Sequence, residues 1–134
     1  MNNIIKLLFV VFISFLSSPS WSETFEDLVE RNGLYYKKFT DVPFTGKKTG
    51  QWTGKIKNGK MEGLWKEYHK NGQLHSKMNF KDGKVNGLWE VYHDNGDFSA
   101  KRTYKDGKKD GTWEWFNEDG SLKRTETWVN GVEQ

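Results

Sequence analysis

Three histidines are the side chains of this sequence best suited to acid–base or metal chemistry. His69 and His93 stand at equivalent positions of a repeated sequence, Asp94 follows the second of them, and His75 is the third. A zinc site takes three or four ligands at a recognisable spacing. No such spacing is completed here, and the chain has no Cys. We therefore predict no metal site and no cofactor.

Carboxylates offer little more for catalysis. Glu67, Glu90 and Glu114 stand at or near equivalent positions of the same repeated sequence, beside Lys or polar residues. No Ser-His-Asp order, phosphate-binding glycine loop or isolated carboxylate pair accompanies them. The absence of Cys also excludes a thiol nucleophile and a disulfide scaffold. We predict that the protein is not an enzyme.

The composition indicates which class of protein this chain belongs to. The 134 residues include seven Trp, five Tyr, nine Phe and 14 Gly, with a formal net charge of +3. Disordered chains are poor in aromatic residues, so we expect a folded domain. A mean hydropathy of −0.88 is too polar for an integral membrane protein. Nucleic-acid binding requires a stronger, clustered positive charge, so we expect no nucleic-acid partner.

The N-terminus has the pattern of an export signal. Lys6 precedes an almost wholly apolar run of ten residues, Leu7 to Leu16, and Ser20 and Ser22 form a small-x-small pattern before Glu23. This order of regions is typical of a cleaved secretory signal. The run is about half the length of a spanning helix, which needs about 20 apolar residues, although an uncleaved anchor is the alternative. We predict a signal peptide at 1–22 and a periplasmic or secreted protein.

A 24-residue period organises the rest of the chain. Gly63-Leu64-Trp65 recurs as Gly87-Leu88-Trp89 and Gly111-Thr112-Trp113. Internal repeats at a fixed step are the signature of a repeat architecture. The glycine and aromatic positions that we expect to define the repeat are Gly63, Trp65, Tyr68, Gly72, Gly83, Gly87, Trp89, Tyr92, Gly96, Gly107, Gly111, Trp113, Phe116, Gly120 and Gly131.

Seven Asn-Gly or Asp-Gly pairs mark the turns, and a longer and a shorter spacing alternate between them. Their glycines are Gly59, Gly72, Gly83, Gly96, Gly107, Gly120 and Gly131. Such pairs accept the positive φ angles of a type I′ turn, which joins paired strands. The spacing leaves room for strands of about 5–8 residues. We therefore predict an all-β fold: an array of antiparallel β-hairpins, as a ribbon or solenoid, with three repeats at 63–86, 87–110 and 111–134.

The faces of the first full hairpin follow in part from alternation. Leu74, Ser76, Met78 and Phe80 alternate with polar residues, so we place these four on the buried face.

Trp65 and Tyr68 are three residues apart and cannot share a face of a regular strand. A bulge and a ring contact at the turn are both open as explanations. We also expect Gly63, Gly87 and Gly111 to permit close packing against the neighbouring Trp.

The segment 23–62 departs from the period and is expected to be a degenerate capping repeat. Leu28 to Arg31, the pair Asn32-Gly33 and Leu34 to Lys37 predict a further hairpin. A short helix over Phe25 to Glu30 is the competing interpretation.

The unit from Gly63 to Leu74, closed by Phe80 to Lys84, resembles the MORN-repeat variant of bacterial YwqK-type antitoxins. Gly33 to Tyr36 and Pro43 to Gly46 look like the opening segment of those proteins. The resemblance covers about Leu28 to Gly131. It implies a β-hairpin ribbon without catalysis that acts through its surface. The antitoxin class implies neutralisation of a partner toxin, and the MORN name implies a membrane-binding role.

Two features could form a binding surface. One is a row of lysines that flank the same series of turns, interleaved with acidic residues; it would meet anionic lipid or an acidic partner, or be a solvated row that discourages edge aggregation. The other is a pair of Trp residues outside the aromatic columns, which we expect to be exposed and able to anchor an interface. The residues are Lys57, Lys60, Lys81, Lys84, Lys105, Lys108, Trp52 and Trp115.

The sequence as a whole favours an exported, non-catalytic repeat protein that serves as a protein-interaction scaffold. The first alternative is an antitoxin or immunity-like protein that neutralises a toxin outside the cytoplasm. The second is an envelope protein that binds a lipid or glycan surface. The pattern identifies neither the partner nor the oligomeric state.

Overall fold

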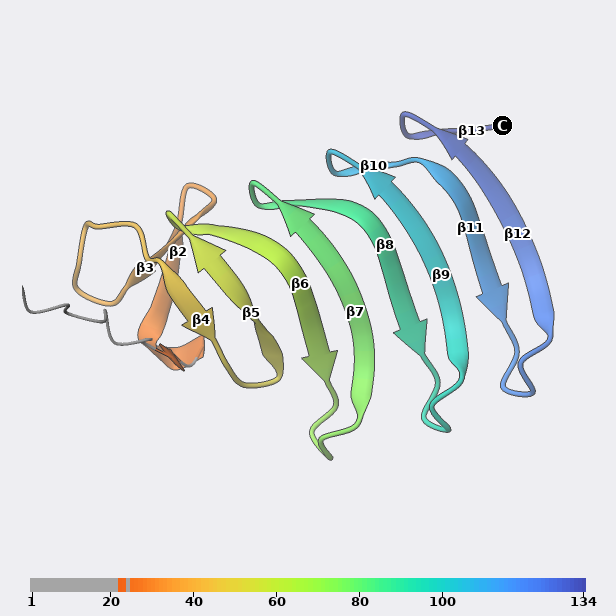
Figure 1. The fold of residues 1–134 in the computed structure, drawn as a ribbon, viewed down its shortest axis with the longest axis horizontal. Helices are drawn as coiled ribbons and strands as arrows, with labels where there is room; N and C mark the ends of the chain where they lie inside the picture. Colours follow the sequence, from red (N-terminus) through yellow and green to blue (C-terminus); the bar gives the residue numbers. More distant parts are fainter. Residues whose placement is uncertain (1–21, 24) are drawn as a thin grey trace, which may run out of the picture.

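Successive antiparallel hairpins build one long, curved sheet (Figure 1). The computed structural model describes residues 22–23 and 25–134, so the predicted signal peptide lies outside the described residues except for Ser22. The order of strands in the sheet is β1-β4-β5-β6-β7-β8-β9-β11-β12-β13, with β10 on β9, and β2 and β3 form a separate hairpin. The predicted all-β fold is confirmed.

The strands are β1 (Ser22–Glu23), β2 (Leu28–Arg31), β3 (Leu34–Lys37), β4 (Gly46–Lys48), β5 (Trp52–Lys57), β6 (Lys60–Tyr68), β7 (Leu74–Lys81), β8 (Lys84–Tyr92), β9 (Phe98–Lys105), β10 (Lys108–Lys109), β11 (Gly111–Phe116), β12 (Leu122–Val129) and β13 (Val132–Glu133). A 3-10 turn, η1 (Phe25–Asp27), precedes β2. Within residues 22–23 and 25–134, no helix has the length and apolar character needed to cross a membrane.

The strand register repeats with the sequence. Trp65 pairs with Met78 between β6 and β7, and Trp89 pairs with Arg102 between β8 and β9. Trp89 and Arg102 stand one full repeat after Trp65 and Met78, so equivalent residues take equivalent places in the sheet. Each hairpin contacts mainly its neighbours, as in other repeat proteins.

The turns are of two kinds, and the prediction of type I′ turns holds for one of them. Positive φ occurs at both residues of the pairs beginning at Asn58, Asp82, Asp106 and Asn130. At the other three pairs the glycine has positive φ and the residue before it does not.

The turn at Gly72 shows why the second kind differs. The backbone N–H of Gly72 donates to the carbonyl of His69 at 2.9 Å, and the N–H of Gln73 donates to Oδ1 of Asn71 at 3.0 Å. The Asn side chain thus closes the loop itself, and the chain makes a longer connection with glycine in the left-handed region.

Close packing against Trp65 involves a different glycine from the one expected. A Cβ on Gly54 would lie 2.3 Å from the Trp65 ring, whereas a Cβ on Gly63 would meet nothing within 4 Å. Gly63 has φ of 70° and lies where the register between β5 and β6 shifts. Its role is therefore conformational. The prediction of Trp packing is wrong for Gly63 and also for Gly87 and Gly111, where a Cβ would meet Asn79 and Thr103 respectively.

The sheet has a face rich in aromatic rings and a face rich in charge. Trp65, Phe80 and their equivalents occupy the ring face. Ser76 and Met78 are 1% and 2% exposed, as the alternation predicts. The pairing shifts by one residue after Glu67, which moves Leu74 to the other face, beside Tyr68.

The charged face shows the consequence of this shift one repeat later. Phe98, the equivalent of Leu74, stacks on Tyr92 at 5.2 Å and lies 3.9 Å from Nζ of Lys101. Lys77 also lies on this face and bonds Glu90 at 2.8 Å, which raises the pKa of Lys77. The column of Trp65 and its equivalents and the column of Tyr68, Tyr92 and Phe116 therefore belong to opposite faces. The bulge reverses the placement predicted for Leu74.

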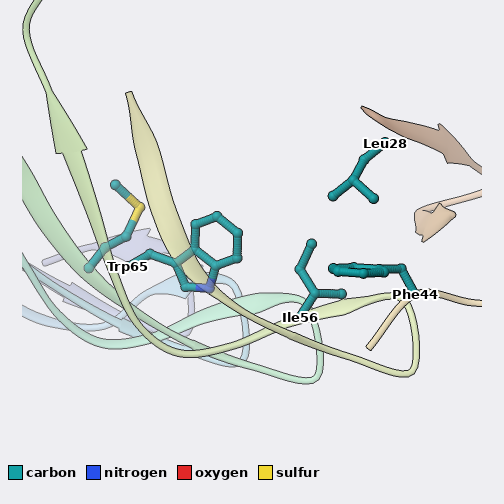
Figure 2. Close-up of a cluster of buried hydrophobic side chains, with 5 residues drawn as sticks. Leu28, Phe44, Ile56 and Trp65 are labelled. Carbon is teal, nitrogen blue, oxygen red and sulfur yellow. The ribbon is translucent and has the colours of Figure 1, made fainter. Parts of the chain in front are cut away.

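The core lies at the N-terminal end of the ring face. The hairpin β2–β3 and the segment between β3 and β4 cover this end, as Figure 2 shows for Leu28 on β2 and Phe44 in that segment, which lie opposite Ile56. Ile56 and Trp65 are 0% and 1% exposed. The backbone N–H of Tyr35 on β3 donates to the carbonyl of Gly59 at 2.7 Å, which joins the hairpin to the first turn of the sheet. The predicted hairpin is confirmed, and the competing helix is limited to η1.

Candidate interaction surface

The ring face continues beyond the hairpin into the last two repeats. Trp89 and Tyr104 have ring centroids 5.8 Å apart, and Tyr104 and Trp113 are 5.1 Å apart. Trp113 in turn lies 5.9 Å from Trp115 and 5.8 Å from Trp128. Trp113 is 5% exposed, while the other four rings are partly exposed. The rings thus form a continuous aromatic surface on which Trp113 is the central, buried member.

Three cations lie over this part of the ring face. The guanidinium carbon of Arg124 is 3.8 Å from the Trp115 ring centroid, and Nζ of Lys109 is 3.7 Å from that of Trp128. Arg102 lies among Trp89, Trp113 and Trp115 at 5.5, 5.3 and 5.9 Å. Such placements are stabilised by attraction of the cation to the ring quadrupole. We call Arg102, Lys109, Trp113, Trp115, Arg124 and Trp128 the C-terminal ring cluster.

One carboxylate lies within the C-terminal ring cluster. Glu126 bonds Arg124 at 3.1 Å and accepts a hydrogen bond from Nε1 of Trp128 at 3.1 Å. The cluster therefore has three cations against one acid, and the Arg124 side chain remains 57% exposed. This arrangement suits an acidic, partly aromatic partner.

The two Trp residues singled out in the sequence have different surroundings. Trp115 belongs to the C-terminal ring cluster. Trp52 lies 6.4 Å from Trp65 and packs against the core. Both are half-buried, so neither is the fully exposed ring that was expected, because stacking along the ring face covers part of each.

The six predicted lysines do line one edge of the sheet. They are all exposed, and they face each other in pairs across the type I′ turns, as Lys57 does Lys60. A Cβ on Gly83 would lie 3.6 Å from Cβ of Lys60, so each turn rests on the lysine of the turn before it. The edge is a stack of similar turns with a solvated row of ammonium groups.

A column of acceptors on this edge escaped the sequence analysis. The side chains of Glu62, Asn86 and Asp110 accept hydrogen bonds of 3.0–3.1 Å from the backbone N–H groups of Asp82, Asp106 and Asn130. Each bond ties one turn to the next. In the sequence these residues are visible as a polar side chain that recurs once in every repeat. From the sequence alone, the acidic ones are interpreted only as charges that neutralise the lysines. These side chains hold the stack together.

His69 and His93, which stand at equivalent positions of the repeat, make different contacts. His69 and His75 contact each other across one hairpin, with Nε2 of His69 3.1 Å from Nδ1 of His75. Nε2 of His93 instead lies 3.0 Å from the carbonyl oxygen of Phe116. In the part of the chain that the structure describes, no group of three or more His, Cys, Asp or Glu residues could hold a metal ion.

A buried lysine is a second feature that sequence reasoning missed. Lys48 on β4 is 2% exposed, and its Nζ donates to the carbonyl of Trp52 at 2.9 Å. Burial lowers the pKa of Lys48 to about 8. Nothing in the local pattern Lys47-Lys48 distinguishes it from its exposed neighbour. The pairing of β4 with β5 decides which is interior, because Lys48 pairs with Gly54 and shares the face of the buried Ile56, whereas Lys47 pairs with Lys55.

Comparison with known proteins agrees with this architecture. The sequence-family model described as MORN repeat variant matches residues 61–82, 85–106 and 109–130. The chain therefore carries three MORN-variant repeats, at the same step as the repeats seen in the sheet. Repeats of this class generally mediate protein or membrane interactions. No curated protein gives a significant match.

Two solved structures share some of the chain's shape. A crystal structure of accessory secretory protein 1, 2 and 3 in Streptococcus pneumoniae aligns with a TM-score of 0.42 and 17% identity, over 77% of this chain and 18% of that chain. The crystal structure of TarM gives 0.40 and 16%, over 81% and 21%. The chain thus spans about a fifth of the length of either solved chain.

Proposed function

We propose that the protein is an exported, non-catalytic scaffold that binds an acidic protein surface through the C-terminal ring cluster. The observation that carries the proposal is the combination of Arg and Trp on an uncovered sheet face. Interface hot spots are enriched in Trp, Tyr and Arg, clustered around a well-packed centre. Trp113 is such a centre, at 5% exposure.

Charge complementarity supports an acidic partner. Three cations and one carboxylate give the cluster an excess positive charge, and Arg124 extends this charge toward solvent. Potentials of opposite sign across an interface steer association and exclude partners of like charge. On the opposite face Lys77 and Glu90 neutralise each other, and Lys101 lies over Phe98 and Phe116.

Photo-crosslinking in the producing cell tests the proposal. A photoreactive phenylalanine at position 115 is expected to capture one protein reproducibly, and the same group at Lys66 on the charged face is the control. Arg124→Glu should abolish the adduct, whereas Lys123→Glu, an equal charge change at an exposed neighbour, should preserve it. Adducts only from position 66, or equal loss in both charge variants, would contradict the proposal.

The export part of the proposal has its own test. It rests on the Lys6, Leu7–Leu16 and Ser20–Ser22 pattern and predicts a mature chain that begins at Glu23. N-terminal sequencing of the protein from the envelope and culture fractions measures this directly. A full-length cytoplasmic chain would reject export and leave the surface proposal intact.

The captured partner also distinguishes the narrower roles. A partner whose toxicity is relieved by co-expression of this protein would make the scaffold an antitoxin or immunity-like protein. Sedimentation with phosphatidylglycerol vesicles that is lost on Arg124→Glu, without any crosslinked protein, would instead indicate a lipid-surface binder.

A further inference from the structure

The outer edge of β12, on the side away from β11, is only partly paired. In the described part of the chain, β13 pairs with β12 only at Trp128 and Val129, and the backbone N–H of Gln134 donates to the carbonyl of Thr127 at 3.0 Å. Among those same residues, no strand pairs with this edge at 124–126. Figure 1 shows β12 as the outermost long strand of the sheet. We call the outer edge at 124–126 the open edge.

The backbone of Thr125 is oriented to pair with a further strand. In an antiparallel ladder, alternate residues direct their N–H and C=O groups to the same side. The carbonyl of Thr127 faces outward, since it accepts from Gln134, and Thr125 therefore faces outward too. Thr125 is also exposed. A strand added at the open edge gains two main-chain hydrogen bonds with Thr125.

The earlier repeats show how such a strand is aligned. Residues 76–78 of β7 pair with residues 89–91 of β8, and Lys101 of β9 pairs with Glu114 of β11. Thr125 stands one repeat after Lys101, so a residue facing Thr125 takes the place of Glu114. The residues on either side of it then face Glu126 and Arg124, which lie on the ring face.

The place that faces Glu126 suits a Trp. In β11, Trp113 holds the equivalent place beside β9, and its Nε1 donates to the carbonyl of Thr103 at 2.9 Å. The same carbonyl accepts from the backbone N–H of Asp110 at 3.1 Å. Thr127 stands one repeat after Thr103 and accepts the equivalent backbone bond. Because a carbonyl oxygen has two lone pairs, Thr127 is able to accept from an indole N–H as Thr103 does.

The place that faces Arg124 suits a short acidic side chain. In the earlier repeats this place is held by Val91 and Trp115. They face small residues, Ser76 and Ala100, so the larger Arg124 requires a smaller residue than Trp. The guanidinium lies over Trp115, away from the open edge. Opposite charges across an antiparallel pair stabilise it, which favours Asp or Glu at this place.

We propose that the open edge binds an extended segment of the acidic partner protein as an added antiparallel strand, in which a Trp faces Glu126 and an Asp or Glu two residues later faces Arg124. The proposal rests on the proposed function, because it describes how the partner reaches the C-terminal ring cluster. Main-chain hydrogen bonds give affinity in this binding mode, and alternate side chains give specificity. Here those side chains lie on the ring face beside Trp128.

A synthetic peptide tests strand addition to the folded protein. The peptide has the sequence of residues 110–119 with the substitution Trp115→Glu, so it keeps Trp113 and presents a carboxylate to Arg124. Hydrogen exchange of single amides is followed by NMR with and without millimolar peptide. Exchange at Thr125 should slow by at least about tenfold, whereas Lys101, which β11 already pairs, should not change. An unchanged Thr125 would overturn the proposal, as would protection without peptide that grows with protein concentration, which would indicate a second copy instead.

Methylation of the peptide backbone separates strand addition from contact with the ring face alone. A methyl group on the nitrogen of residue 114 removes the donor to Thr125 and should weaken binding at least about tenfold. The matched control is a methyl group on the nitrogen of residue 113, which points away from β12 and should change the affinity by about twofold or less. Equal effects of the two methyl groups would overturn the proposal.

Side-chain changes test the Trp and the acid separately. In the peptide, Trp113→Ala should weaken binding at least about tenfold, and Gln in place of the introduced Glu should weaken it about fivefold. Arg124→Gln in the protein should remove the second difference and keep the first; if it removes neither, the proposed pairing of Arg124 is wrong. If the peptide does not add to β12 but photo-crosslinking at position 115 still captures an acidic protein, strand addition is wrong and the proposed function stands. If nothing is captured, both are overturned.

Discussion

The two ends of the ring face use the same repeat for different purposes. At the N-terminal end, β2–β3 covers Ile56 and Trp65, and these side chains form a core that is at most 1% exposed. In the last two repeats Trp115 is only half-buried, and Arg124 lies over its ring in place of a hairpin. The repeat therefore supplies a row of rings, and the presence or absence of a covering hairpin such as β2–β3 decides whether those rings are core or surface.

Strand β12 shows how the C-terminal end of the ring face differs in sequence. Arg124 is the equivalent of Ser76 and Ala100, which are both 1% exposed. Inner repeats need small side chains there, because the next strand packs against them. The third repeat has a large cation at this position instead, and this cation lies over Trp115.

The largest expected effect is a loss of folding stability when the core at the covered, N-terminal end of the ring face is emptied. Trp65→Ala should lower the free energy of unfolding by about 4 kcal/mol, because it empties the centre of the core. Trp115→Ala should lower it by only about 1 kcal/mol, since that ring is partly in solvent. Urea denaturation measures both, and equal losses would mean that the two ends are packed alike.

A smaller loss is expected where the backbone approaches Trp65. Gly54→Ala would place a Cβ 2.3 Å from the ring and should destabilise the protein by about 3 kcal/mol through overpacking. Gly63→Ala, whose Cβ would meet nothing within 4 Å, should cost about 1 kcal/mol from its left-handed backbone alone. Thermal denaturation of the two variants gives the contrast, and a harmless Gly54→Ala would contradict the packing.

The buried amine of Lys48 should make the free energy of unfolding depend on pH. The pKa of Lys48 is about 8 in the folded state and 10.5 ordinarily, so the unfolded chain binds more protons between these values. Stability should therefore rise with pH across this window, and the penalty is fully present below pH 8. Lys48→Met removes the cost of burying the ammonium, so the variant should be more stable than wild type at pH 7. This difference in the free energy of unfolding should decrease by about 1–2 kcal/mol from pH 7 to pH 10.

Paired urea titrations at several pH values measure that difference and cancel the other titrating groups. Lys47→Met, at the adjacent position, is the matched control and should give a flat difference. A flat difference for Lys48→Met as well would show that its ammonium is not desolvated.

The smallest effect concerns the stack of turns that both ends share. Glu62→Ala removes the acceptor for the N–H of Asp82 and should cost about 0.5–1 kcal/mol. Glu62→Gln keeps an acceptor, as Asn86 does one repeat later, and should be nearly neutral. If the two variants lose the same stability, the contribution is that of charge rather than of the hydrogen bond.

The regular part of the fold was predictable because its signals are local. Asn-Gly and Asp-Gly pairs fix the turns, and alternation places Ser76 and Met78 inside. The position of Leu74 was not predictable, because the shift after Glu67 arises from the pairing of two strands. Lys48 and Gly54 were missed for a similar reason, since their environment is made by the pairing of β4 with β5 and by the Trp65 ring. The lysine edge was predicted correctly in its location, and its binding role stays a prediction.

The most direct test of the central claim is hydroxyl-radical footprinting of the tryptophans in the folded, dilute protein. A covered N-terminal core and an open C-terminal ring cluster predict oxidation of Trp115 and Trp128 at least about tenfold faster than that of Trp65, in proportion to exposed ring area. The crosslinked partner, once identified, should protect Trp115 and leave Trp65 unchanged. Equal oxidation of Trp65 and Trp115 in the free protein would contradict the claim that one repeated face is core at one end and surface at the other.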